Sequence, residues 1–313
     1  MEQYLAFDIG GTFVKYGIVG ANAEILESGK VNTPSTLDQL LDIINEISRA
    51  YPEVAGIAIS APGAVSDEGV IYGSSAVRYI HGPNIKNLVM ERTSKPVFME
   101  NDANCAGYAE VWNGAAKGKK DALVMVIGTG IGGAIFKNGE LHKGSHLHGG
   151  EFGYMLLTSD VQSNNDVWSR VASTAALVRN VAKAKQVTPE SLSGEEIFRL
   201  AESGDPDCRA AVNQFYHLLA VGIYNLQYIY DPEVIVIGGG ISAREDLIGK
   251  INEKLDVILE SIDLAKIKPE ITACKFRQNA NLLGAVYGFI QHFTKEKVAQ
   301  FAIYLETSQM RQY

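Results

Sequence analysis

The chain opens on short apolar runs separated by tight turns. Residues 4–19 read as a strand, a glycine turn and a second strand, and residues 23–30 supply a third strand after the turn at Ala21 and Asn22. Three strands joined by such short connections predict an antiparallel β-meander whose first turn is polar and rich in glycine.

The pattern then changes to alternating helices and strands. Leucine and isoleucine recur at helical spacing between residues 37 and 47, and the apolar run at residues 54–59 predicts a buried strand. Residues 96–99 predict another strand, and it runs into a segment of helix-forming composition at residues 103–112. Asp102 is therefore expected where a strand ends and a helix begins.

The same order restarts in the middle of the chain. Residues 122–141 again read as strand, glycine turn, strand and turn, and residues 207–230 and 233–237 predict a long helix followed by an apolar strand. The repeated meander indicates two related halves that meet near the basic segment 117–120. These features predict an α/β protein with a duplicated, actin-like (ribonuclease H-like) fold, in two domains with a cleft between them.

Composition narrows the class of protein. With 313 residues, of which 46% are hydrophobic, the chain is long enough for two cores, and its net charge of −8 argues against a general nucleic-acid surface. The three cysteines, Cys105, Cys208 and Cys274, are too dispersed for a disulfide framework or paired zinc ligands. The sequence shows neither a signal peptide nor an apolar run of membrane-spanning length, so a cytoplasmic protein without membrane or nucleic-acid partners is expected.

Three glycine-rich turns each follow an apolar strand, at residues 8–12, 128–133 and 238–242. Glycine lets backbone N–H groups approach phosphate oxygens, so three such turns favour nucleotide binding over simple tight turns. A Walker A loop is absent, and the GxGxxG run at residues 128–133 continues as a strand instead of the helix that a dinucleotide site requires. The candidate ATP-binding residues are Asp8, Gly10, Gly11, Thr12, Lys15, Gly128, Thr129, Gly130, Gly132, Gly239 and Gly240.

Two acidic positions carry candidate chemistry. Asp8 follows the first strand and could hold Mg²⁺ directly or through water, although an aspartate here could instead cap its own turn. Asn101 and Asp102 form an amide and acid pair suited to sugar hydroxyls, with Asp102 as the general base. The same pair would also serve as a helix N-cap.

A third candidate, Glu151, lies in the stretch 148–154, which is rich in groups that bind hydroxyls. The nearby His142, His146 and His148 could suggest a metal site, but loop histidines this close together are more often solvated. No ligand role is assigned to them.

Taken together, the motifs resemble those of the ROK family (repressors, open reading frames and sugar kinases) over nearly the whole chain. The resemblance rests on DIGGT at 8–12, APG at 61–63, ENDAN at 100–104, IGTGIGG at 127–133, GEFGY at 150–154 and DPEVIVIGGGIS at 231–242. It implies an ATP- and Mg²⁺-dependent sugar kinase with the sugar held by Gly63, Asn101, Asp102, Glu151 and Tyr154. It further implies ATP phosphates on the turns at 8–12 and 128–132 and adenosine near 238–241.

The resemblance also bears on organisation and assembly. It implies a homodimer and a C-terminal helix at residues 293–313 that returns to the first domain, so the expected domains are 1–118 with 293–313, and 119–292. Because DIGGT begins at residue 8, the DNA-binding segment that precedes it in the repressors of the family is not expected here.

Two departures from the family pattern refine the expected substrate. The family's E-x-G-H becomes Glu151-Phe-Gly-Tyr154, and its cysteine-rich zinc cluster has no counterpart in residues 158–174, which implies a zinc-free member. Ser169 or a neighbour stands where the family has a second sugar-binding glutamate, and a smaller group there would leave room for a substituent on the anomeric carbon. The chain is thus similar to bacterial β-glucoside kinases, which phosphorylate the 6-hydroxyl of disaccharides such as cellobiose.

Other functions remain open at this point. One is a glucokinase or an N-acetylmannosamine kinase that acts on a free hexose, and a second is a sugar sensor without turnover. A third, an actin-like filament protein, would have no use for ENDAN or GEFGY.

Overall fold

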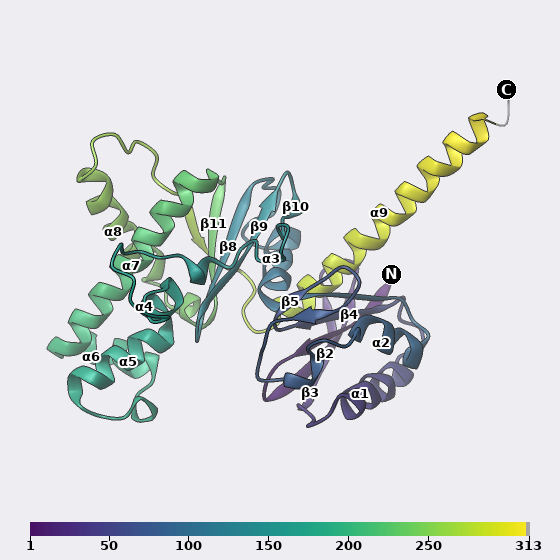
Figure 1. Cartoon of the computed structure of the whole chain (residues 1–313), viewed down its shortest axis with the longest axis horizontal. Coiled ribbons are helices and arrows are strands. Elements are labelled where there is room, and N and C mark those ends of the chain that lie inside the picture. Colours follow the sequence, from purple (N-terminus) through teal and green to yellow (C-terminus); the bar gives the residue numbers. More distant parts are fainter. Residues whose placement is uncertain (311–313) are drawn as a thin grey trace. The chain divides into compact units, whose positions relative to one another are not determined.

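The computed structural model describes residues 1–310, which form two compact units (Figure 1). The first comprises Met1–Asn113 together with the chain from Gln278 onward, and the second is Gly114–Arg277. In the part of the chain that the structure describes, no helix is both long and apolar enough to cross a bilayer.

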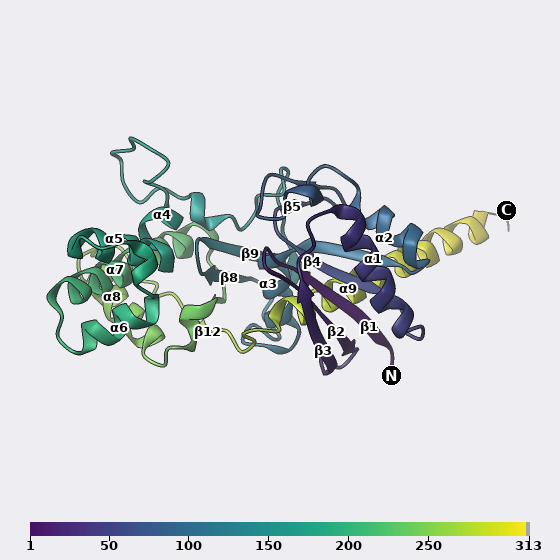
Figure 2. The ribbon, with the colours of Figure 1, turned by 90° about the horizontal axis from the view of Figure 1, so that it is seen from below.

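The first unit is built on a mixed five-stranded sheet of order β3-β2-β1-β4-β7. As predicted, β1 (Gln3–Ile9), β2 (Phe13–Gly20) and β3 (Ile25–Asn32) form an antiparallel meander, which Figure 2 shows as three neighbouring strands. The strands β4 (Ile57–Ala61) and β7 (Val97–Asn101) extend the sheet in parallel with β1. The carboxyl ends of β1, β4 and β7 therefore meet at one edge.

Short elements complete this unit. Helix α1 (Leu37–Ala50) starts at the N-cap Thr36 and buries Leu40, Leu41 and Ile44, because these side chains recur at helical spacing. The smaller elements are β5 (Ala64–Val65), β6 (Ile71–Tyr72), the 3₁₀ turn η1 (Arg78–Ile80), α2 (Ile85–Thr93) and α3 (Asp102–Asn113).

The second unit repeats the sheet with the order β10-β9-β8-β11-β12. Its strands are β8 (Ala122–Ile127), β9 (Ile131–Lys137), β10 (Glu140–Leu141), β11 (Val234–Gly238) and β12 (Ile271–Ala273). The first three are antiparallel, and β11 and β12 are parallel to β8, as in the first unit. The duplication predicted from the repeated meander is thus confirmed.

Helices cover the second sheet. They are η2 (Phe152–Tyr154), α4 (Trp168–Ala172), α5 (Thr174–Lys185), η3 (Pro189–Ser191), α6 (Gly194–Glu202), α7 (Pro206–Tyr230), η4 (Gly240–Ala243) and α8 (Leu247–Glu260). Helix α7 ends where Asp231 adopts the left-handed conformation and Pro232 follows, in agreement with the end predicted at residue 230. The fully buried Trp168 and the residues Phe215 and Ile237 belong to the core of this unit.

Helix α9 (Ala280–Met310) is one continuous helix that packs in the first unit, beside α3 and against β1, β4 and β7 (Figures 1 and 2). The sequence instead placed residues 281–292 in the second domain and began a separate C-terminal helix at 293. The difference arises because an apolar pattern at helical spacing shows that one face of a helix is buried but not which sheet it packs on. Residues 311–313 of the expected helix lie outside the described residues.

The contact between α9 and α3 is unusually close. A Cβ atom added to Gly284 would lie 1.6 Å from the carbonyl oxygen of Cys105 in α3. The two helix backbones can approach so closely only because residue 284 has no side chain.

Candidate active site

The edge where β1, β4 and β7 end carries a row of polar side chains. Asp8 lies opposite Ser60 in the parallel register, and Ser60 lies opposite Glu100. Oδ1 of Asp8 accepts hydrogen bonds from Ser60 Oγ at 2.8 Å and from Asn281 Nδ2 at 3.0 Å. Sequence reasoning identified Asp8 but neither of its two partners.

The turn after β1 follows directly on this edge. Gly10 N donates to Phe13 O at 3.0 Å, which closes the turn, and Gly11 and Thr12 are exposed. Lys15 lies on β2 opposite Asp8, and its Nζ donates to the carbonyl of Gln278 at 3.4 Å. The turn thus leaves polar groups accessible beside Asp8, as an anion site requires.

The predicted sugar-binding residues of this unit come together where β7 meets α3. Asn101 Oδ1 accepts from the backbone N–H groups of Ala103 and Asn104, at 2.9 and 3.1 Å, and Asn101 Nδ2 donates to Gly63 O at 3.0 Å. Asn101 is therefore the N-cap of α3, and its side chain also links α3 to the turn at Gly63. Asp102 is the first residue of α3, and its Oδ1 accepts from Ala103 N at 2.8 Å.

The buried thiol of Cys105 lies near several carboxylates of this edge. Burial raises the pKa of Cys105 well above its usual value, and the neighbouring Glu100, Asp8 and Asp102 raise it further. Cys105 is therefore a neutral packing residue of α3.

His81 is a residue of this region that the sequence did not indicate. Its Nε2 lies 2.8 Å from Ser75 Oγ, and a Cβ atom at Gly63 would come within 3.0 Å of its Cε1. Among the described residues, its buried Nδ1 has no hydrogen-bond partner. No motif surrounds His81, so its position beside Gly63 follows only from the fold.

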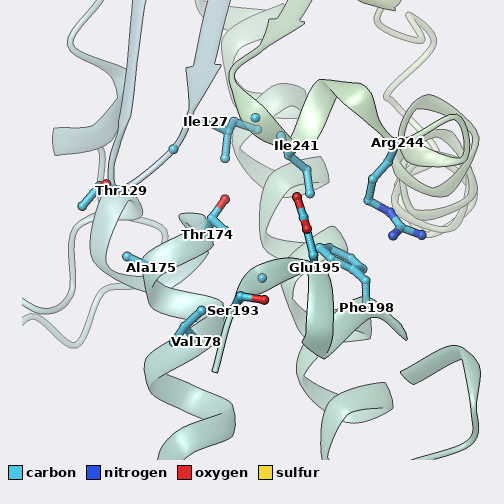
Figure 3. Close-up of a pocket in the computed structure, with 13 residues that line it drawn as sticks. Ile127, Thr129, Thr174, Ala175, Val178, Ser193, Glu195, Phe198, Ile241 and Arg244 are labelled. Atoms are coloured by element: carbon cyan, nitrogen blue, oxygen red, sulfur yellow. The ribbon is translucent and has the colours of Figure 1, made fainter. Parts of the chain in front are cut away.

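A pocket of about 670 Å³ lies in the second unit (Figure 3). Its lining residues are Ile127, Gly128, Thr129, Thr174, Ala175, Val178, Ser193, Gly194, Glu195, Phe198, Gly240, Ile241 and Arg244. The Arg244 guanidinium lies 4.2 Å from the centre of the Phe198 ring and pairs with Glu202 and Asp246, at 2.8 and 2.9 Å. Apolar walls with a few fixed polar groups are typical of a small-molecule site.

Two helices begin at this pocket. Thr174 starts α5 and Gly194 starts α6, where Ser193 caps the helix by accepting from Glu196 N at 3.1 Å. Thr174 N donates to Gly128 O at 3.0 Å and so ties α5 to the glycine turn. Helix N-termini favour negative charge, which suits a phosphorylated ligand.

The predicted glycines of this unit differ in their roles. Gly239 has a φ of 88°, and a Cβ atom there would lie 2.1 Å from Ile127 O, so only glycine allows β11 to turn so close to β8. Gly128 and Gly240 line the pocket directly. Gly132, in β9, pairs with Val126 of β8 and does not line either of the two pockets of this unit.

A second pocket of about 540 Å³ adjoins the first, because Thr129 lines both. Its other lining residues are Gly130, Ile131, Glu151, Gly153, Tyr154, Asn164, Val167, Ser169 and Arg170. Glu151 and Tyr154 thus line the same pocket, and Tyr154 is 68% exposed. Asn164 and Arg170 were missed, since they carry no motif.

Ser169 has a definite structural role in this pocket. Its Oγ accepts from Ile131 N at 2.7 Å and lies 3.1 Å from Ile131 O, to which it donates. Because the hydroxyl both accepts from and donates to the backbone of Ile131, Ser169 stabilises the 128–131 turn. Its small side chain also leaves the pocket open.

Residues 158–174 stand where other members of the family have a zinc cluster. Here the Asp166 carboxylate holds part of this segment by hydrogen bonds. Asp166 Oδ2 accepts from the backbone N–H groups of Gln162 and Ser163, at 2.9 and 2.7 Å. These hydrogen bonds hold the pKa of Asp166 below its usual value. Residues 158–174 contain no cysteine or histidine, so their donor set does not suit zinc.

The architecture and the sites define an α/β protein with duplicated sheets and a nucleotide-sized pocket next to a polar one. The ROK family model matches residues 4–292, and the chain belongs to the ROK family. Its structural neighbours in that family have the actin-like two-domain fold, which confirms the predicted fold class.

Several relatives have assigned functions. A beta-glucoside kinase from Listeria monocytogenes is 38% identical over 91% of this chain and 97% of its own length, and a glucokinase from Streptomyces coelicolor is 30% identical over 79% and 85%. A ROK family protein from Streptococcus pneumoniae, solved in complex with sucrose, is 37% identical with a TM-score of 0.88 over 94% of this chain and 99% of that protein. A glucokinase from Streptomyces griseus, solved with glucose and AMPPNP, has a TM-score of 0.74 at 26% identity and covers 90% of this chain and 97% of its own.

Proposed function

We propose that this chain is an ATP-dependent sugar kinase that transfers the γ-phosphoryl group to the 6-hydroxyl of a glucose unit, preferably in a β-glucoside such as cellobiose. The observation that carries the proposal is the pair of adjoining pockets that share Thr129, one suited to a nucleotide and one lined by Glu151 and Tyr154. The kinase names of the ROK relatives support the same reaction class.

In the proposed reaction, Asp102 is the general base. Its carboxylate takes the proton of the sugar 6-hydroxyl while the sugar oxygen forms a bond to the γ-phosphorus and the bond to the β-phosphate oxygen breaks, so that ADP leaves. The cap formed by Asn101 fixes the start of α3 and with it the position of Asp102.

The glycine-rich turns would hold the nucleotide. Gly10, Gly11 and Thr12, and likewise Gly128, Thr129 and Gly130, would contact phosphates, and the 670 Å³ pocket would take the adenosine. When bound with the nucleotide, Mg²⁺ neutralises charge on the phosphate oxygens. Asp8 fits as its anchor, because the hydrogen-bond donors to its carboxylate among the described residues, Ser60 and Asn281, are neutral and leave its charge available.

Filling the nucleotide pocket should weaken ATP binding without disturbing the fold. A Cβ atom at Gly240 meets no atom within 4 Å, so Gly240→Leu would project into the pocket. We expect the KM for ATP to rise about tenfold or more, the equivalent of about 1.4 kcal/mol. The control is Gly249→Leu in α8, where a Cβ atom is equally unobstructed but lies outside the lining of this pocket. Equal KM values in the two variants would contradict the assignment.

Preference for a β-glucoside would come from the outer part of the second pocket. Tyr154, Asn164 and Arg170 line it, and Ser169 is turned onto the backbone of Ile131. An aromatic face together with amide and guanidinium donors suits a second sugar ring linked to the phosphorylated glucose.

The test is ADP release with ATP and Mg²⁺ against glucose, N-acetylmannosamine, cellobiose and gentiobiose. We expect the highest kcat/KM with a β-linked disaccharide. In Arg170→Ala the KM for that disaccharide should rise about tenfold, from loss of a charged hydrogen bond, while the KM for glucose stays unchanged. Arg209→Ala on the exposed face of α7 is the control. Turnover of glucose alone would support a glucokinase. The absence of ADP release with every sugar would favour a sugar sensor.

The proposal includes no zinc. The loop at residues 160–166 would be held in shape by the Asp166 carboxylate, in place of the metal expected from other members of the family. Metal analysis of the purified protein should then find no bound zinc, and a stoichiometric zinc content would overturn this part.

A further inference from the structure

Two donors from distant parts of the chain converge on one oxygen of Asp8. Ser60 is 52 residues away on β4 and Asn281 is 273 residues away in the first turn of α9, and both hydrogen bonds end on Oδ1. The described residues provide no hydrogen bond to Oδ2 of Asp8. This asymmetry leaves one carboxylate oxygen fixed and the other available.

The chemistry of the three groups determines the direction of each bond. An ionised aspartate can only accept, so the Asn281 amide must face it with its nitrogen, and the Ser60 hydroxyl must donate. Both donors are neutral, so they orient the carboxylate without cancelling its charge. A lysine or arginine at either position would have competed with a cation for Asp8.

The donors themselves are held by packed structure. Ser60 is completely buried on β4, in register with Asp8. Asn281 is fixed by α9, where the next residues, Leu282 and Leu283, are buried and Gly284 permits the close contact with α3. A side chain that is locked by its surroundings can orient a neighbouring ligand group.

We propose that Ser60 and Asn281 are positioning residues that fix the Asp8 carboxylate so that Oδ2 is presented to the Mg²⁺ of the bound nucleotide. The inference rests on the proposed function, in which Asp8 anchors the magnesium ion. It assigns the C-terminal helix a part in nucleotide binding, although α9 lies far from β1 in the sequence.

The experiment measures the affinity for ADP by calorimetry, once with Mg²⁺ and once with EDTA, in the wild type and in Asn281→Ala, Ser60→Ala and the double variant. Loss of an outer-shell partner lowers metal affinity by roughly 10–100-fold. We therefore expect the ratio of the ADP affinity with Mg²⁺ to the ADP affinity in EDTA to fall about tenfold or more in each single variant. The affinity in EDTA should stay unchanged. Because both donors serve one oriented carboxylate, the effects in the double variant should not be additive.

Controls separate this role from a merely structural one. Asn279→Ala alters an exposed side chain two residues away and should leave the ratio as in the wild type. Alanine is a better helix former than asparagine, which offsets part of the hydrogen bond that Asn281→Ala removes, so the variant should unfold within a few degrees of the wild type even as the ratio falls. In kinetic assays, kcat should fall while the KM for the sugar is unchanged.

The outcomes are distinguishable. An unchanged ratio in Asn281→Ala and Ser60→Ala would overturn the inference and leave the hydrogen bonds as ties between α9 and the sheet. If Mg²⁺ does not improve ADP binding even in the wild type, the assignment of Asp8 within the proposed function fails, and the inference falls with it. If the ratio falls as expected but no sugar is phosphorylated, the positioning role stands and the kinase proposal does not.

Discussion

Replacing Asp102 with asparagine should lower kcat by a factor of about 10² to 10⁴, the range that a general base contributes. An amide cannot take the proton from the sugar hydroxyl, but its oxygen can still accept the hydrogen bond from Ala103 N that Asp102 Oδ1 accepts at 2.8 Å. The start of α3 should therefore keep its structure, and the KM for ATP should change little. ADP release at saturating sugar measures the effect.

The matched control for this variant is Asp38→Asn, which removes an exposed carboxylate on α1 of the same unit. Its kcat should equal that of the wild type. An Asp102→Asn enzyme that retains a large share of the wild-type kcat would exclude Asp102 as the base, whatever the substrate.

Gly284→Ala should destabilise the first unit by about 1–3 kcal/mol, the usual cost of overpacking a core, or by more. The added Cβ atom would lie 1.6 Å from Cys105 O and 3.0 Å from Ala109 N, and these are backbone atoms of a helix that cannot move aside without shifting α3. Since α9 carries Asn281, the same shift should also reduce activity. Urea unfolding measures the change in free energy.

The control is the same substitution at Gly249, an exposed position of α8. A Cβ atom there meets nothing within 4 Å, so the better helix propensity of alanine should stabilise the protein by up to about 1 kcal/mol. The two substitutions should therefore have opposite signs. A stabilised Gly284→Ala variant would contradict the described contact between α9 and α3.

Much of the fold could be predicted because each element carries its own pattern. The short apolar runs of β1 and β2, the glycine turn between them and the repeat of both in β8 and β9 are local signals. The partner of α9 could not be predicted, because helical spacing reports that a face is buried and not which of two sheets covers it. The expected homodimer stays a prediction.

For the site, motifs located single residues but not their partners. Asp8 and Asp102 stand where strands end, and this is visible in sequence. Ser60 and Asn281 reach Asp8 through strand register and helix packing. Such positions follow from tertiary contacts between segments that no short motif joins.

The division of the first unit between the two ends of the chain affects how the protein is made. Synthesis releases Met1–Asn113 first, but α9, whose residues Leu282, Leu283, Val286 and Phe289 are buried in this unit, emerges last. At about 5–20 residues per second, the roughly 170 residues in between take on the order of 10–30 s. The second unit is continuous in sequence and can fold during that interval. The first unit still lacks α9, so part of its apolar surface stays exposed to solvent. Binding by a ribosome-associated chaperone would therefore be expected on nascent chains that end before residue 280.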